Sequence, residues 1–139
     1  MKKGKKIISV EEIRNSLAFM FKDEGLRLIL LFGSAVSWKM HKQSDIDIAF
    51  LFDKPVDILG LTNKVIRLLH TDNIDVVDLK RASPLLKFLV ATDGRLLYER
   101  KEGMFNEFYS LAFRTYVDTK KLRNAQSIAI KNFVKSRGL

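Results

Sequence analysis

Apolar residues recur at helical spacing in several segments of the chain, and each such segment predicts a helix. In the first, Ser9 and Glu12 have the spacing of a capping box, the apolar positions continue to Phe21, and Gly25 is the stop signal. Further helices are expected over residues 58–69, 85–91 and 104–136. The last of these segments contains neither Pro nor Gly, so it forms either one long helix or two helices with a break near Asp118 and Thr119.

Shorter apolar runs that are bounded by turn residues predict strands. Residues 26–32 form an almost continuously apolar run that ends at Gly33 and Ser34. Residues 45–52 begin with strict alternation of polar and apolar positions and then become continuously apolar. A third strand is expected over residues 74–79, and residues 95–99 are expected to add an extended edge.

The connections between these strands predict how the strands pair. Only ten residues separate Ser34 from Asp45, which is too few for a crossover, so the first two strands should be antiparallel. A helix joins the second strand to the third, and this βαβ unit makes those two strands parallel. We therefore expect one α/β (α+β) domain over residues 1–139, a small mixed sheet flanked by helices, with its core in residues 26–98 and C-terminal helices in residues 103–137.

The composition is that of a globular protein with one hydrophobic core. The chain has 139 residues, of which 47% are hydrophobic. No apolar run reaches the roughly 18 to 20 residues that a membrane span requires, and acids follow the N-terminal lysines too closely for a signal peptide. We therefore expect a cytoplasmic protein without a membrane segment. The chain has no Cys and only two His, which leaves carboxylates to hold any metal and favours a hard cation such as Mg²⁺.

The formal net charge of +9 is concentrated at the two ends of the chain. Four lysines lie in residues 1–6, which we expect to form a flexible basic tail, and six Lys or Arg follow Asp118 without any acid. The rest of the chain carries a net charge of about −1, so direct nucleic-acid binding is expected only through the basic termini. Either these charges solvate a tail and a helix face, or they form a docking surface for an acidic partner or RNA.

Acidic residues at the ends of the predicted strands form the main candidate site. Asp45 and Asp47 point to one face of their strand with Cα atoms about 6.6 Å apart, and they repel each other unless a cation lies between them. The alternative for this pair alone is two exposed side chains at the mouth of a strand. Because the second and third strands are parallel, Asp75 should lie near the pair, whereas Asp78 should lie about 10 Å farther along and on the opposite face.

The turn at Gly33 and Ser34 predicts a phosphate site beside these carboxylates. Gly permits a close approach of the backbone, and the exposed N–H groups of such a turn, together with a short helix that starts near Ser34, can cradle phosphate oxygens. Carboxylates that bind divalent metal and face a phosphate cradle are the arrangement used in two-metal phosphoryl chemistry.

These motifs together resemble the GSx10DxD signature of the nucleotidyltransferase superfamily related to DNA polymerase beta. The size of the chain is similar to that of the minimal nucleotidyltransferases of prokaryotes, and the resemblance covers residues 26–98. The resemblance implies two Mg²⁺ ions held by three carboxylates and a nucleotide whose outer phosphates are held by the Gly-Ser turn. The implied residues are Asp45, Asp47, Asp75, Gly33 and Ser34.

The chain departs from this family in its phosphate contacts. Relatives commonly have Arg-Gly at the third and fourth positions after the Ser, where this chain has Ser37 and Trp38. Another cation must then face the triphosphate, and the nearby candidates are Lys39, His41 and Lys42.

The resemblance also implies a reaction and a partner. The reaction is transfer of AMP from ATP: an acceptor hydroxyl attacks the α-phosphorus, pyrophosphate leaves, and Asp75 is placed to take the proton. The chain has no room for a separate substrate domain, and minimal nucleotidyltransferases commonly pair with a small helical HEPN-type toxin. The expected function is therefore that of an antitoxin which forms a hetero-oligomer with the toxin and adenylylates one of its tyrosines.

The alternative function is that of a non-catalytic binding module. Such a module would neutralise a toxin or an RNA by occlusion, and its carboxylates would be vestigial. For either function, the aromatic helical segment over residues 104–116 and the basic segment after it are candidate docking surfaces, although aromatic residues at this spacing also suit a core.

Overall fold

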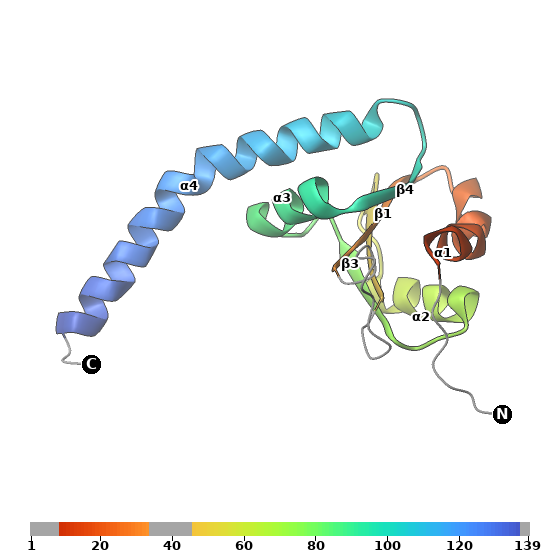
Figure 1. Cartoon of the computed structure of the whole chain (residues 1–139), viewed down its shortest axis with the longest axis horizontal. Helices are drawn as coiled ribbons and strands as arrows, with labels where there is room; N and C mark the ends of the chain where they lie inside the picture. The colour runs from red at the N-terminus through yellow and green to blue at the C-terminus, as the bar shows by residue number, and fades with distance from the viewer. Residues whose placement is uncertain (1–8, 34–45, 137–139) are drawn as a thin grey trace.

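A computed structural model of the chain describes residues 9–33 and 46–136. Its centre is a four-stranded sheet in the order β3-β2-β1-β4, with helices on both faces (Figure 1). The strands are β1 (Leu26–Phe32), β2 (Ile46–Phe52), β3 (Ile74–Asp78) and β4 (Arg95–Glu99). The helices are α1 (Val10–Leu17), the 3₁₀-helix η1 (Ala18–Lys22), α2 (Ile58–Leu69), α3 (Pro84–Asp93) and α4 (Met104–Ser136).

The first three strands pair as their connections predict. β1 and β2 are antiparallel, with Phe32 opposite Asp47, and β2 and β3 are parallel, with Asp47 opposite Asp75. β4 pairs with the other side of β1 and is antiparallel to it, with Arg95 opposite Leu31. The predicted mixed α/β fold is therefore confirmed. The end of β1 meets the starts of β2, β3 and β4 at one edge of the sheet.

Both faces of the sheet are covered, which explains the nearly continuous apolar character of β1 and β2. On one face, Ile48 and Phe50 of β2 are fully buried in a core that includes residues of α1 and α2. On the other face, Leu30 and Ala49 are fully buried against residues of α3 and the first turns of α4. By the alternation of side chains along β2, Asp47 belongs to the face of α3 and α4.

The first helical segment begins as predicted but ends differently. Ser9 and Glu12 form a complete capping box, in which the Glu12 backbone N–H donates to the Ser9 hydroxyl oxygen at 3.1 Å. The prediction of one continuous helix up to Phe21 is wrong, because α1 stops at Leu17 and continues as the 3₁₀-helix η1. Side chains three residues apart lie on one side of a 3₁₀-helix, and this winding buries both Leu17 and Met20.

α4 is a single helix through Asp118 and Thr119, so the alternative with a break there is wrong. Its first half packs on α3, where the ring of Phe88 stacks on that of Tyr116 with centroids 4.1 Å apart. Its second half extends beyond the body of the molecule (Figure 1), and the described residues after Arg123 are all exposed. Among the described residues, no helix has the length and apolar character that crossing a membrane requires.

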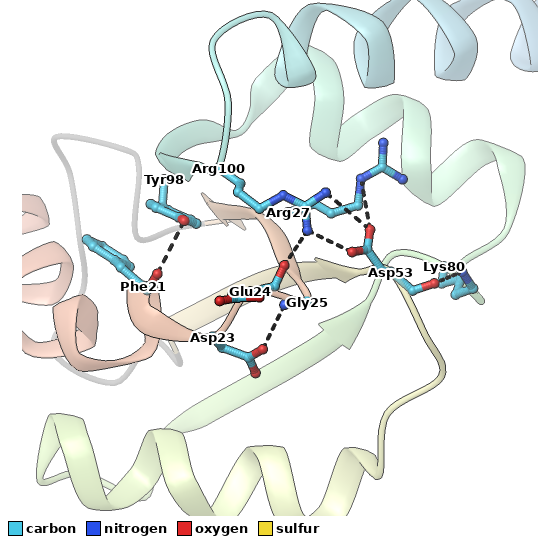
Figure 2. A network of polar contacts seen from close by, with 9 residues as sticks. All are labelled: Phe21, Asp23, Glu24, Gly25, Arg27, Asp53, Lys80, Tyr98 and Arg100. Carbon is cyan, nitrogen blue, oxygen red and sulfur yellow. Dashed lines mark hydrogen bonds and ion pairs between the residues drawn. The ribbon is translucent and has the colours of Figure 1, made fainter.

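An ion-pair network joins the other edge of the sheet, remote from the starts of β2 and β3 (Figure 2). Arg100, directly after β4, donates from Nη1 to Asp53 Oδ2 at 2.7 Å and to the carbonyl oxygen of Glu24. Arg27 Nε lies 3.6 Å from Asp53 Oδ1, and Lys80 Nζ donates to the carbonyl oxygen of Asp53 at 2.7 Å. The network therefore links segments at the ends of all four strands.

Candidate active site

Gly33 forms the turn at the end of β1, and its conformation requires glycine. Its φ is +74°, in the left-handed region, where a residue with a Cβ is less stable by about 1–2 kcal/mol. A Cβ added to Gly33 would also lie 2.2 Å from Asp47 Oδ2, far inside van der Waals contact. The missing side chain of Gly33 therefore allows the Asp47 carboxylate to lie against the backbone of the turn.

Asp47 is the central acidic residue of the described part of the site. β2 lies between β1 and β3, and Asp47 is opposite Phe32 on one side and opposite Asp75 on the other. Opposite residues of adjacent strands are about 4.8 Å apart and project to the same face, so the two carboxylates are neighbours. Asp75 is exposed and Asp47 is half-buried. The predicted proximity of Gly33, Asp47 and Asp75 is what the sheet register produces.

Asp78 lies away from this cluster, at the far end of β3. It is opposite Phe50 in the parallel pair, three positions beyond Asp75, and alternation places it on the other face. Its Oδ1 accepts a hydrogen bond from the backbone N–H of Lys80 at 3.0 Å, and its carbonyl oxygen accepts one from the Arg81 N–H at 3.1 Å. Asp78 therefore closes the turn after β3.

The other predicted site residues lie in residues 34–45, outside the described part of the chain. These predictions concern Ser34, Lys39, Lys42 and Asp45, and they stay predictions. Among the described residues, no group of three or more His, Cys, Asp or Glu side chains could hold a metal ion. Two of the three predicted metal ligands, Asp47 and Asp75, are described.

Arg95 is a cation at the same edge that sequence reasoning did not select. Arg95 is the first residue of β4, and its side chain is exposed. It lies opposite Leu31, which precedes Gly33 by two residues in β1. By strand alternation, Arg95 and Leu31 project to the face of α1 and α2, whereas Asp47 projects to the face of α3 and α4. Lys39 and Lys42 therefore remain our candidates for the triphosphate. Only the β1–β4 register could have revealed Arg95.

A hollow of about 480 Å³ lies at the opposite edge of the sheet from Gly33 and Asp47. It is bordered by the segments that precede β1 and follow β2, at the edge of the ion-pair network (Figure 2). Three acidic side chains line it together with apolar residues and one Lys, which is a poor environment for a triphosphate. Its lining residues are Asp23, Glu24, Gly25, Phe52, Asp53, Lys54, Pro55 and Val56. We therefore place the candidate active site at the carboxylate edge.

Comparison with known proteins identifies the class to which this fold and site belong. Residues 15–103 match the family described as Polymerase beta, Nucleotidyltransferase. The match spans more than half of the chain, so the chain belongs to this nucleotidyltransferase family. The expected family is therefore confirmed.

Curated relatives carry a more specific name. A protein of Aphanizomenon flos-aquae (strain 2012/KM1/D3) named protein adenylyltransferase MntA is 29% identical over 148 residues, covering 96% of this chain and 98% of the relative. A protein of the same name from Shewanella oneidensis is 41% identical over 76 residues, covering 52% of this chain and 54% of the relative.

Solved structures resemble the chain over most of its length. A chain in a crystal structure described as a toxin-antitoxin with AMP-PNP is 30% identical, with a TM-score of 0.74, covering 85% of this chain and 98% of that chain. A chain in a structure of a tri-AMPylated Shewanella oneidensis HEPN toxin in complex with MNT antitoxin is 28% identical, with a TM-score of 0.70, covering 87% of this chain and 98% of that chain.

Proposed function

We propose that this chain is a protein adenylyltransferase that transfers AMP from ATP to a tyrosine hydroxyl of a HEPN-domain toxin and thereby acts as its antitoxin. The observation that carries the proposal is the match to a protein adenylyltransferase over nearly the full length of both chains. The structure of a tri-AMPylated HEPN toxin with its antitoxin supports the choice of acceptor, and the AMP-PNP complex supports ATP as the donor.

The site residues in this proposal are the neighbouring carboxylates and the turn beside them. Asp47 and Asp75 fit a divalent cation because adjacent carboxylates on one sheet face repel each other unless a cation neutralises them. We propose Asp45, outside the described residues, as the third ligand. When bound, Mg²⁺ would neutralise charge on the triphosphate and lower the pKa of the acceptor hydroxyl.

The residues around the Asp47 carboxylate then have different roles in the transfer. The turn at Gly33 and Ser34, with Lys39 and Lys42, holds the outer phosphates, and the backbone N–H groups of such a turn suit this role. A bond forms between the acceptor oxygen and the α-phosphorus, and the bond from that phosphorus to pyrophosphate breaks. Asp75, exposed at the edge, accepts the proton of the hydroxyl.

Intact-mass measurement of the toxin tests this proposal. The purified HEPN-domain toxin that is the proposed partner is incubated with the chain, ATP and Mg²⁺, and we expect its mass to increase by one or more AMP units. Asp47→Asn should abolish the increase, because it removes the central carboxylate, while the complex still forms. A stable complex without any mass increase would instead support neutralisation by occlusion.

A further inference from the structure

The C-terminal half of α4 presents an exposed apolar stripe. Leu122, Ile130 and Val134 are 59%, 62% and 37% exposed, although each is a residue type that is normally buried. Figure 1 shows that this half of the helix runs beyond the sheet and the other helices. Aliphatic side chains that gather on one face of a projecting helix are typical of an interaction surface.

The stripe continues the face with which α4 packs on the body of the molecule. Ala112 is buried in that contact, and Ile130 follows it by eighteen residues, which is about five complete turns of an α-helix. Leu122 and Val134 lie within about 80° of the same direction. The apolar side of α4 therefore continues past the part that the fold covers, with Thr119 and Arg123 lying on the same side between the two parts.

The charges beside the stripe indicate what kind of surface can cover it. The described part of α4 after Asp118 carries five Lys or Arg and no acid. Three of them, Lys120, Lys131 and Lys135, lie on one neighbouring face of the helix, about 80–140° from Ile130. A second copy of the same helix would bring like charges together, so charge complementarity disfavours self-association and favours an acidic partner.

We propose that the apolar stripe of α4, formed by Leu122, Ile130 and Val134, is the surface that docks the HEPN toxin, which covers it with an apolar strip bordered by Asp and Glu. This inference rests on the proposed function for the identity of the partner. Beyond the proposed function, the inference specifies where the toxin binds and which side chains its surface must present. The docking surface lies on a projecting arm, remote from the body that holds the carboxylates, so binding and transfer can be perturbed separately.

A pair of matched substitutions tests the docking surface. Ile130 and Ile128 are both isoleucines, 62% and 58% exposed, and they lie two positions apart on nearly opposite sides of α4. Gln suits a helix at least as well as Ile, so neither Ile130→Gln nor Ile128→Gln should disturb the fold. Melting temperatures and circular dichroism of both variants check this.

The measured quantity is the dissociation constant for the purified toxin. We expect Ile130→Gln to weaken binding by at least about tenfold, which corresponds to about 1.4 kcal/mol, and Ile128→Gln to bind almost as tightly as the wild type. The double charge reversal Lys131→Glu and Lys135→Glu should also weaken binding, and added salt should reduce the affinity of the wild type. In transfer assays, Ile130→Gln should raise KM for the toxin without lowering kcat.

These measurements distinguish failure of the docking proposal from failure of the proposed function. A toxin that is adenylylated by the wild type and bound equally well by Ile130→Gln would overturn the docking surface and leave the proposed function intact. A toxin that binds through Ile130 but gains no AMP would overturn the proposed function and leave the docking surface intact. The docking proposal would also be overturned if the toxin did not bind at all. It would equally be overturned if Ile130→Gln left toxin binding unchanged and instead abolished self-association or binding to anionic lipid vesicles.

Discussion

Asp75 and Asp78 are three positions apart in β3, and the sheet gives them different surroundings. Asp75 is opposite Asp47 at the edge where β1 ends, and it is exposed. Asp78 is opposite Phe50 and accepts a hydrogen bond from the backbone N–H of Lys80. A sequence pattern of Asp-x-x-Asp does not separate the two residues, whereas the register of two parallel strands does.

We predict that Asp75→Asn and Asp78→Asn differ in their effect on AMP transfer. Asp75→Asn should lower the rate of AMP transfer by about 10²–10⁴-fold because it removes the proposed base. It should change the free energy of unfolding by no more than about 0.5 kcal/mol because the side chain is exposed. Asp78→Asn keeps an oxygen that can accept from Lys80, so the transfer rate should stay close to that of the wild type.

Transfer assays and thermal melts of both variants check this prediction. A fully active Asp75→Asn together with an inactive Asp78→Asn would contradict both the assignment of the base and the argument from register. Equal loss of activity in the two variants with unfolding of both would instead indicate that β3 as a whole tolerates neither change.

At the scale of the elements, local patterns predicted most of the boundaries. β1, β4 and α2 begin and end where their hydrophobic patterns indicate, at residues 26–32, 95–99 and 58–69. The end of the first helix differed, because the choice between α-helical and 3₁₀ winding after Leu17 depends on how Leu17 and Met20 reach the core. Helix ends of this kind depend on tertiary packing more than on local preference.

The ion-pair network joins elements that are distant in sequence, and the charge of Asp53 determines its strength. The hydrogen bond from the Arg100 guanidinium, with added attraction from Arg27 and Lys80, holds the pKa of Asp53 below its ordinary value of 3.8. A carboxyl group whose pKa is lower in the folded than in the unfolded chain stabilises the fold above the unfolded pKa. That contribution is lost as the pH falls through the lowered folded pKa.

We therefore predict a pH-dependent effect of Arg100→Gln. At pH 6 the variant should melt at a lower temperature than the wild type, because Asp53 loses its main hydrogen-bond donor. The difference should shrink as the pH falls below about 4, where protonation of Asp53 weakens the pair in the wild type as well. Melting curves of both proteins between pH 3 and 6 measure this.

Lys54→Gln is a matched control for the network. It removes one positive charge directly beside Asp53, but Lys54 is not among the groups that lower the Asp53 pKa. Its melting temperature should follow that of the wild type over the same pH range. A constant difference between Arg100→Gln and the wild type at every pH would show that Arg100 acts by packing and not through the charge of Asp53.

At the scale of the whole molecule, metal binding should be linked to global stability. Asp47 and Asp75 come together only in the folded sheet, so a cation that binds them stabilises the folded state relative to the unfolded chain. At a Mg²⁺ concentration ten times the Kd, the expected stabilisation is about 1.4 kcal/mol. For a domain of this size, such a change should raise the melting temperature by a few degrees.

Thermal melts with and without Mg²⁺, in the presence of a non-hydrolysable ATP analogue, test this linkage. Asp47→Asn should retain the fold by circular dichroism and lose most of the rise in melting temperature. NaCl at the same ionic strength is the control for screening of surface charge. If Mg²⁺ and nucleotide together do not stabilise the wild type, the proposed metal site is wrong.

The sequence by itself determined most of the elements, the pairing of the first three strands and the candidate acids. Hydrophobic spacing acts over a few residues, and the lengths of the connections were enough to make β2 antiparallel to β1 and parallel to β3. Only the tertiary structure decided that a side chain at Gly33 would collide with Asp47 and that Arg100 pairs with Asp53. It also decided that the rest of the molecule covers the apolar side of α4 in its first half only. Each of these depends on segments that are distant along the chain and are brought together by strand register and helix packing, which local spacing does not encode.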